Sequence, residues 1–133
     1  MAHSRQPGGA CRLLLVEHDA RVMDELRRLF GGPTFDCELA RSVRTAEQIL
    51  ADRRMDVIAV DAALDGLPRG GTPALIQQLK ARGPGMKVVI FNGMTAKAGQ
   101  RRMRRLGADG YLSKKNSLQA LLRSVQRLVG GDA

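Results

Sequence analysis

The chain has 133 residues, of which 44% are hydrophobic and 26% charged, values typical of one soluble globular domain. No apolar run approaches the roughly 20 residues needed to cross a membrane, and the polar first ten residues lack the apolar core of a secretory signal, so we expect a cytoplasmic protein. The formal net charge of +9 is unevenly distributed: residues 1–65 carry nine Lys or Arg and eleven Asp or Glu, whereas residues 66–133 carry thirteen and two.

The first half of the chain alternates short apolar runs with helical patterns. We expect residues 1–10, which are polar and glycine-rich, to form a flexible tail ahead of a single domain at 11–130. A nearly continuous apolar run predicts a buried strand at 11–17, and an alternating run predicts an edge strand at 35–40. A helical pattern lies between them, and Ser42 is placed to cap a second helix.

The second half continues the alternation. Three further strands are predicted at 56–61, 86–91 and 109–113. Thr72, followed by Pro73, fits an N-cap with proline at the first helical position. Because each strand is followed by a helical pattern, a βα unit occurs five times with short connections. Right-handed crossovers then give a five-stranded parallel sheet with helices on both faces.

One predicted helix, residues 95–106, is strongly basic. Its thin apolar stripe consists of Ala96, Gly99, Met103 and Leu106. Its other side holds Arg101, Arg102, Arg104 and Arg105. Four like charges within five residues favour a surface that meets an acidic protein or nucleic acid, with plain solvation as the alternative.

Polar side chains follow the predicted strands at their carboxyl ends, where open α/β sheets bind their ligands. Glu17 follows the first strand, Asp61 ends the third, Asn92 follows the fourth and Lys114 follows the fifth. Asp61 is a candidate nucleophile or metal ligand, and Lys114 could neutralise its charge. Asn92 could donate a hydrogen bond to an anion held between them. A divalent cation with phosphoryl oxygens would suit such a site, because hard cations bind oxygen.

These residues lie in segments that resemble the response-regulator receiver domain of two-component signalling. The segments span about residues 11–129 and read RLLLVEHD, DVIAVDAALDG, KVVIF and GADGYLSK. The resemblance implies a flavodoxin-like, doubly wound α/β fold with a sheet of order 2-1-3-4-5. It also implies a histidine kinase or phosphotransfer protein as partner, which donates a phosphoryl group to an aspartate with the assistance of Mg²⁺.

The resemblance also implies roles for individual residues. Asp61 would be the phosphoacceptor, with Lys114 beside it. Glu17, Asp61 and the backbone carbonyl of Ala63 would hold the metal. Tyr111 would be the aromatic switch residue whose rotamer reports phosphorylation.

Several positions depart from the family's pattern. The two acids that hold Mg²⁺ in receivers read Glu17-His18 here, so that His18 brings an imidazole to a carboxylate position. Because Mg²⁺ prefers oxygen to nitrogen ligands, we predict a weak Mg²⁺ site. Asn92 takes the place of a hydroxyl residue in the catalytic set. Asp65 and Lys115 replace prolines, and we expect a trans bond before Lys115 because a cis bond there is costly.

Four of these positions also have simpler interpretations. Asp19 is favoured as the N-cap of the first helix over a shifted metal ligand. His18 is a lone polar residue in the simplest interpretation, with a soft-metal ligand or a pH-sensitive group as alternatives. Asp61 and the Asn92-Gly93 pair could also be turn residues without a further role.

The sequence therefore predicts an atypical receiver domain that transmits signals and is not an enzyme, beyond phosphorylation and dephosphorylation of its own Asp61. It either accepts a phosphoryl group there or acts as a phosphorylation-impaired protein-interaction module. Its basic face is expected to meet an acidic protein surface, and a homodimer is a further possibility. The alternative is a basic nucleic-acid-binding module that uses helix 95–106. Only 3% of residues are aromatic and no nucleic-acid motif is present, so this alternative is less favoured.

Overall fold

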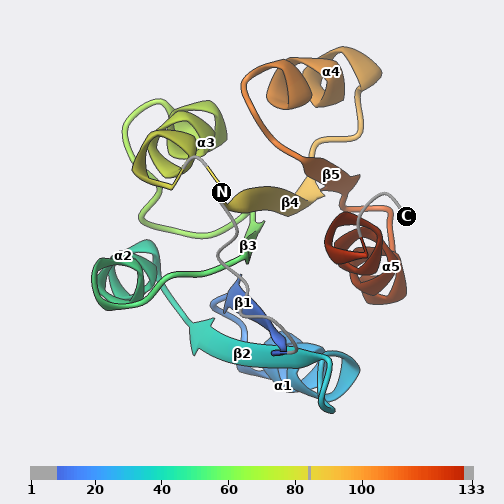
Figure 1. Ribbon diagram of the computed structural model, residues 1–133. Helices are drawn as coiled ribbons and strands as arrows, with labels where there is room; N and C mark the ends of the chain where they lie inside the picture. Colours follow the sequence, from blue (N-terminus) through green and yellow to red (C-terminus); the bar gives the residue numbers. More distant parts are fainter. Residues whose placement is uncertain (1–8, 84, 131–133) are drawn as a thin grey trace.

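Strands and helices alternate along the part of the chain that the computed structural model describes, residues 9–83 and 85–130 (Figure 1). The strands are β1 (Cys11–Val16), β2 (Phe35–Ala40), β3 (Val57–Asp61), β4 (Lys87–Gly93) and β5 (Gly110–Ser113). The helices are α1 (Ala20–Leu29), α2 (Val43–Asp52), α3 (Gly71–Arg82), α4 (Lys97–Arg105) and α5 (Leu118–Val129). Most of the predicted tail, residues 1–8, lies outside the described residues. Among those described, no helix has the length and apolar character that a bilayer span requires.

The five strands form one parallel sheet of order β2-β1-β3-β4-β5, which confirms the predicted doubly wound fold. β1 pairs with β2 on one side and with β3 on the other. The strand order therefore reverses direction at β1, and a crevice opens beyond the carboxyl ends of β1 and β3. β2 is the edge strand, as its alternating sequence predicted, and its middle residues are partly exposed.

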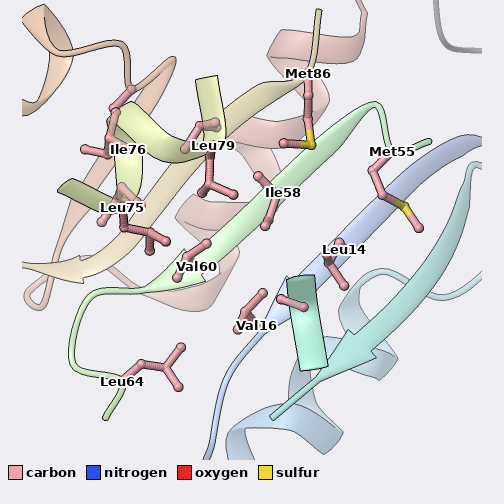
Figure 2. Packing of buried hydrophobic residues seen from close by; sticks show 14 of the residues in the cluster. Leu14, Val16, Met55, Ile58, Val60, Leu64, Leu75, Ile76, Leu79 and Met86 are labelled. Atoms are coloured by element: carbon pink, nitrogen blue, oxygen red, sulfur yellow. The ribbon is translucent and has the colours of Figure 1, made fainter. Parts of the chain in front are cut away.

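Helices cover both faces of the sheet, and each face has its own apolar cluster. One face packs Leu14 and Ile58 against α2, α3 and α4, and Ile76 of α3 is fully buried in this cluster (Figure 2). The other face packs against α1 and α5 through Leu26 and Leu121. Burying each such side chain contributes roughly 1.5–3 kcal/mol. Coverage on both faces explains why the central strands are apolar almost throughout.

Two helix starts agree with the predicted caps. The Asp19 carboxylate accepts from the backbone N–H groups of Arg21 and Val22, at 2.8 and 3.4 Å. The Ser42 hydroxyl accepts from the Thr45 N–H at 3.1 Å. Each bond satisfies a donor that the first helical turn leaves without a partner. The capping interpretation of Asp19 is therefore confirmed.

The predicted cap at Thr72 is wrong, because α3 begins at Gly71. The Gly71 N–H bonds to the Pro68 carbonyl at 2.9 Å, and Gly70 is the N-cap with a φ of 98°. Two glycines with positive φ turn the chain before Thr72 is reached, and no side chain caps this helix. Pro73 falls in the first turn, where its missing N–H costs nothing.

Candidate functional site

An open pocket of about 280 Å³ lies at the carboxyl end of the sheet, next to β1, β3, β4 and β5. Its lining brings together five of the residues predicted from the strand ends, namely Glu17, His18, Asp61, Asn92 and Lys114. This position is the crevice expected at the topological switch point. Neither Ala63 nor Tyr111 is among the described residues that line it.

Asp61 is the last residue of β3 and lies at the floor of the pocket, with only 2% of its surface exposed. Its Oδ1 accepts from the backbone N–H of Ala63 at 2.8 Å and from Nδ2 of Asn92 at 3.0 Å. Its Oδ2 lies 3.9 Å from Nδ1 of His18. One carboxylate oxygen is thus held by two donors, and the other faces the ionisable groups of the pocket. The contact of Ala63 with Asp61 is made by its N–H, and its predicted metal-binding carbonyl stays a prediction.

Asn92 reaches Asp61 because β4 extends beyond residue 91, where the predicted strand ends. The strand continues through Asn92 to Gly93, across a bulge against β5 between Ile90 and Gly93. Asn92 has a φ of 59°, in the left-handed region that asparagine tolerates better than most residues. This backbone turns the amide toward Asp61. In this structure the acceptor of the Asn92 amide is Asp61 itself, and its predicted hydrogen bond to an anion stays a prediction.

Glu17 follows β1 and is also buried, with 3% of its surface exposed. Its Oε2 accepts from the Asp19 N–H at 3.0 Å. The pKa of Glu17 is raised to about 7, chiefly by burial and also by the neighbouring Asp61 carboxylate, against the lowering effect of the Asp19 N–H and of His18. Near neutral pH this carboxyl group is therefore divided between its protonated and ionised forms.

His18 forms the outer wall of the pocket, and 51% of its side chain is exposed. Its Nδ1 lies 3.5 Å from Oε2 of Glu17 and 3.9 Å from Oδ2 of Asp61. Its carbonyl oxygen accepts from Nε and Nη2 of Arg41, at 3.2 and 2.7 Å. One ligand atom from each of Glu17, His18 and Asp61 can be chosen so that all three lie within 4.8 Å of one another.

Lys114 lines the pocket but is exposed. Within the described residues it has no ion pair with Asp61 at 4.0 Å or less. Its backbone N–H bonds to the Gly93 carbonyl at 2.9 Å, so its main chain is fixed while its long side chain stays free. Sequence reasoning missed Asn116, whose Oδ1 accepts from the Ser113 N–H at 2.8 Å and shapes this loop. The described residues contain no cis peptide bond, as expected for Lys115.

Tyr111 lies in β5 and points inward, with 5% of its surface exposed. Its hydroxyl accepts from the backbone N–H of Met94 at 2.8 Å. The ring occupies the space where a Cβ at Gly93 would stand. Sequence reasoning named Tyr111 but missed that Gly93 and Met94 hold it. The only signal for this packing was the glycine after Asn92.

The arginines of α4 are exposed at all four predicted positions, 101, 102, 104 and 105. Only Met103 of this helix is fully buried, and the helix contains no acidic residue. Arg104 differs from the other three because its Nη2 donates to the Tyr111 carbonyl at 3.3 Å. The basic surface therefore consists mainly of Arg101, Arg102 and Arg105, while Arg104 joins α4 to β5.

Comparisons with known proteins agree with this geometry. Residues 13–126 match the model of the response regulator receiver domain family. The response regulator MprA of Mycolicibacterium vanbaalenii is 27% identical over 118 residues, covering 89% of this chain and 50% of that protein. MprA of Mycobacterium ulcerans is 26% identical over the same shares of the two chains. The chain thus spans about half the length of the curated relatives it matches.

Solved structures share the fold. A CheY-like receiver domain protein from Methanospirillum hungatei has a TM-score of 0.78 at 18% identity, covering 92% of this chain and 95% of that one. The receiver domain of an HD domain-containing protein from Pseudomonas fluorescens has 0.76 at 23%, covering 91% and 95%. A Burkholderia pseudomallei response regulator with a phosphorylated aspartic acid, calcium ion and citrate has 0.72 at 20%, covering 87% and 66%. These matches give the nucleic-acid-binding alternative no support.

Proposed function

The chain belongs to the response regulator receiver domain family, and we propose that it serves two-component signalling by accepting a phosphoryl group on Asp61. The observation that carries this proposal is the asymmetry of the Asp61 carboxylate. Two donors hold Oδ1, whereas Oδ2 lies 3.9 Å from Nδ1 of His18, in the pocket that both residues line. A nucleophilic oxygen oriented in this way is prepared for attack on an incoming phosphorus atom. The phosphorylated aspartic acid in the Burkholderia pseudomallei structure supports the assignment by analogy of fold.

The proposed reaction moves a phosphoryl group from a phosphohistidine of a histidine kinase or phosphotransfer protein. Oδ2 of Asp61 attacks the phosphorus, the bond from phosphorus to the imidazole nitrogen breaks, and an acyl phosphate forms. Catalysis of such transfers rests on positioning and on neutralising charge. The exposed Lys114 ammonium, which lines the pocket, neutralises the charge of the phosphoryl oxygens. The second amide hydrogen of Asn92 is free to donate to one of them.

Receivers use Mg²⁺ at this position, and the donor set of this chain fits Mg²⁺ poorly. Mg²⁺ requires close to octahedral oxygen coordination. The described side chains that gather here are two carboxylates and one imidazole, from Glu17, Asp61 and His18. We therefore propose that Mg²⁺ binds weakly at this site. Slow phosphorylation, or none, with Mg²⁺ alone would make the chain the phosphorylation-impaired interaction module of the same family.

We propose that the α4–β5–α5 side of the domain carries the output contact, with an acidic protein surface as its target. Arg101, Arg102 and Arg105 lie on this side, and no acidic residue of α4 offsets them. Tyr111 lies between the pocket and this surface, because its hydroxyl bonds to Met94 and its carbonyl to Arg104. A change at Asp61 would reach α4 through the short segment that joins Asn92 to Met94. A second copy of the chain is the other candidate partner.

Incubation with acetyl phosphate, followed by intact-mass measurement, tests the acceptor assignment. The native chain should gain one phosphoryl group, and Asp61→Asn should gain none. Asp65→Asn is the matched control, because Asp65 is an exposed carboxylate of the same loop. It should be phosphorylated like the native chain. Equal labelling of the native chain and Asp61→Asn would show that another group is modified.

A further inference from the structure

We propose that Glu17, His18 and Asp61 form a binding site for a first-row transition-metal dication such as Zn²⁺, with the His18 imidazole as a direct ligand. The proposal rests on the proposed function in one respect, since it concerns the pocket around the same Asp61. It goes beyond that function because the third ligand is an imidazole nitrogen instead of a carboxylate oxygen, and the ion is a transition-metal dication instead of Mg²⁺. The family pattern supplies carboxylate oxygens at this point, and this chain supplies nitrogen.

The spacing of the three side chains suits such an ion. Nδ1 of His18 lies 3.5 Å from Oε2 of Glu17 and 3.9 Å from Oδ2 of Asp61. Zinc binds nitrogen and oxygen at about 2.0–2.2 Å in tetrahedral geometry, which places neighbouring ligand atoms roughly 3.3 Å apart. Small rotations of the three side chains are therefore enough to close the site. The half-exposed His18 ring has room to make the largest of them.

The chemistry of the donors selects the ion. A neutral imidazole is a good ligand for Zn²⁺ and other late first-row dications and a poor one for Mg²⁺. Two carboxylates and one imidazole leave the fourth position of a tetrahedral ion open toward the pocket, the arrangement of catalytic rather than structural zinc sites. That open position faces the space where a phosphoryl oxygen would bind.

Burial of the Glu17 and Asp61 carboxylates favours the binding of a cation between them. Glu17 and Asp61 are both almost fully enclosed, and one carboxylate oxygen of each lies within 4.8 Å of the other, so that their like charges repel. A dication at the centre of the cluster would remove this repulsion and stabilise both carboxylates in their charged forms. The two bonds from Arg41 to the His18 carbonyl fix the main chain that carries the third ligand. The main chain at His18 is therefore held in place before any ion binds, and only side chains need to rotate.

Calorimetric titration of the full chain with Zn²⁺ and, separately, with Mg²⁺ tests the inference. The native chain should bind one Zn²⁺ more tightly than Mg²⁺. His18→Ala should weaken Zn²⁺ binding by at least about tenfold, since even residues that only support a ligand commonly cost that much. His18→Asp should reverse the preference by raising Mg²⁺ affinity. Substitution of Co²⁺ adds a spectroscopic readout, because the intense visible bands of tetrahedral Co²⁺ respond to its ligands and should shift or weaken in His18→Ala.

Two controls separate this site from other zinc ligands of the chain. His3 is the other histidine, and His3→Ala should leave Zn²⁺ affinity unchanged. Cys37 is a half-buried thiol whose pKa is raised to about 11 by burial, and Cys37→Ser should also have no effect. Loss of binding in either control, or unchanged Zn²⁺ affinity in His18→Ala, would overturn the proposal. Because no phosphodonor is present, failure of zinc binding and failure of Asp61 phosphorylation are separate results.

Discussion

Asn92 donates a hydrogen bond from Nδ2 to Oδ1 of Asp61 at 3.0 Å while its own backbone has a φ of 59°. The two features depend on each other, because the left-handed backbone at the end of β4 turns the amide toward the end of β3. The amide then supplies one of the two bonds that hold a buried carboxylate oxygen. Residue 92 therefore contributes both to the stability of the fold and to the position of the proposed nucleophile.

Asn92→Ala should destabilise the domain by about 1–3 kcal/mol, because it removes a hydrogen bond to a buried carboxylate and forces alanine into the left-handed region. Asn92→Gly should cost less, since glycine adopts positive φ without strain. Urea unfolding of the native chain and the two variants measures the cost of the lost hydrogen bond and the cost of the backbone strain. Equal losses in the two variants would mean that the backbone at this position stores no strain.

Gly93→Ala should destabilise the domain by about 1–3 kcal/mol, because the added methyl group meets the buried Tyr111 ring. The same substitution in a Tyr111→Ala background should cost much less, since the obstructing ring is gone. Urea unfolding of the four proteins completes a double-mutant cycle. Additive effects would show that the Gly93 and Tyr111 positions are not coupled.

The general fold could be predicted because its signals are local. Apolar runs of strand length, helical patterns and the caps at Asp19 and Ser42 all agreed with one topology. The missed features depend on contacts between distant segments. The bulge that extends β4 to Gly93 arises from its pairing with β5, and the start of α3 depends on two positive-φ glycines. Local sequence patterns do not specify either.

The candidate site shows the same division. Its residues could be named from the sequence because parallel strands bring their carboxyl ends to one edge. Their chemistry could not, because it depends on burial and distance. Glu17 has a raised pKa only because the fold encloses it beside Asp61, and Lys114 lines the pocket without an ion pair to Asp61 among the described residues.

The pKa of Glu17 predicts how stability depends on pH in the metal-free protein. The folded-state value of about 7 lies above the usual 4.5, so the folded chain binds the proton more tightly than the unfolded chain does. The contribution of Glu17 to stability is therefore full below about pH 4.5 and is lost as the pH rises to about 7, by up to roughly 3 kcal/mol.

Glu17→Gln isolates this contribution. In the presence of a chelator, urea unfolding across the same pH range should show a fall in stability for the native chain that the glutamine variant lacks. The variant should also be the more stable protein at about pH 8, where its side chain carries no buried charge. Parallel pH profiles for the two proteins would show that Glu17 titrates normally.

The basic face should bind acidic polymers through specific positions rather than through net charge. Arg101→Glu with Arg105→Glu should leave the fold intact and abolish most binding to poly-glutamate, and native binding should weaken steeply as salt rises. Arg21→Glu with Arg28→Glu changes the charge equally on α1, where both residues are exposed, and should retain most binding. Equal losses of poly-glutamate binding in the two double variants would show that binding depends only on net charge. Tighter binding to duplex DNA than to poly-glutamate would favour the nucleic-acid alternative.

Location of the phosphoryl group on the chain shows directly whether Asp61 is the acceptor. The chain is treated with acetyl phosphate in the presence of Mg²⁺ or of Zn²⁺, reduced with borohydride and mapped by peptide mass spectrometry. An acyl phosphate on Asp61 is reduced to homoserine, so we expect homoserine at position 61 and at no other carboxylate. Homoserine at another position, or none under either metal while a receiver of known activity is labelled in parallel, would contradict Asp61 as the acceptor.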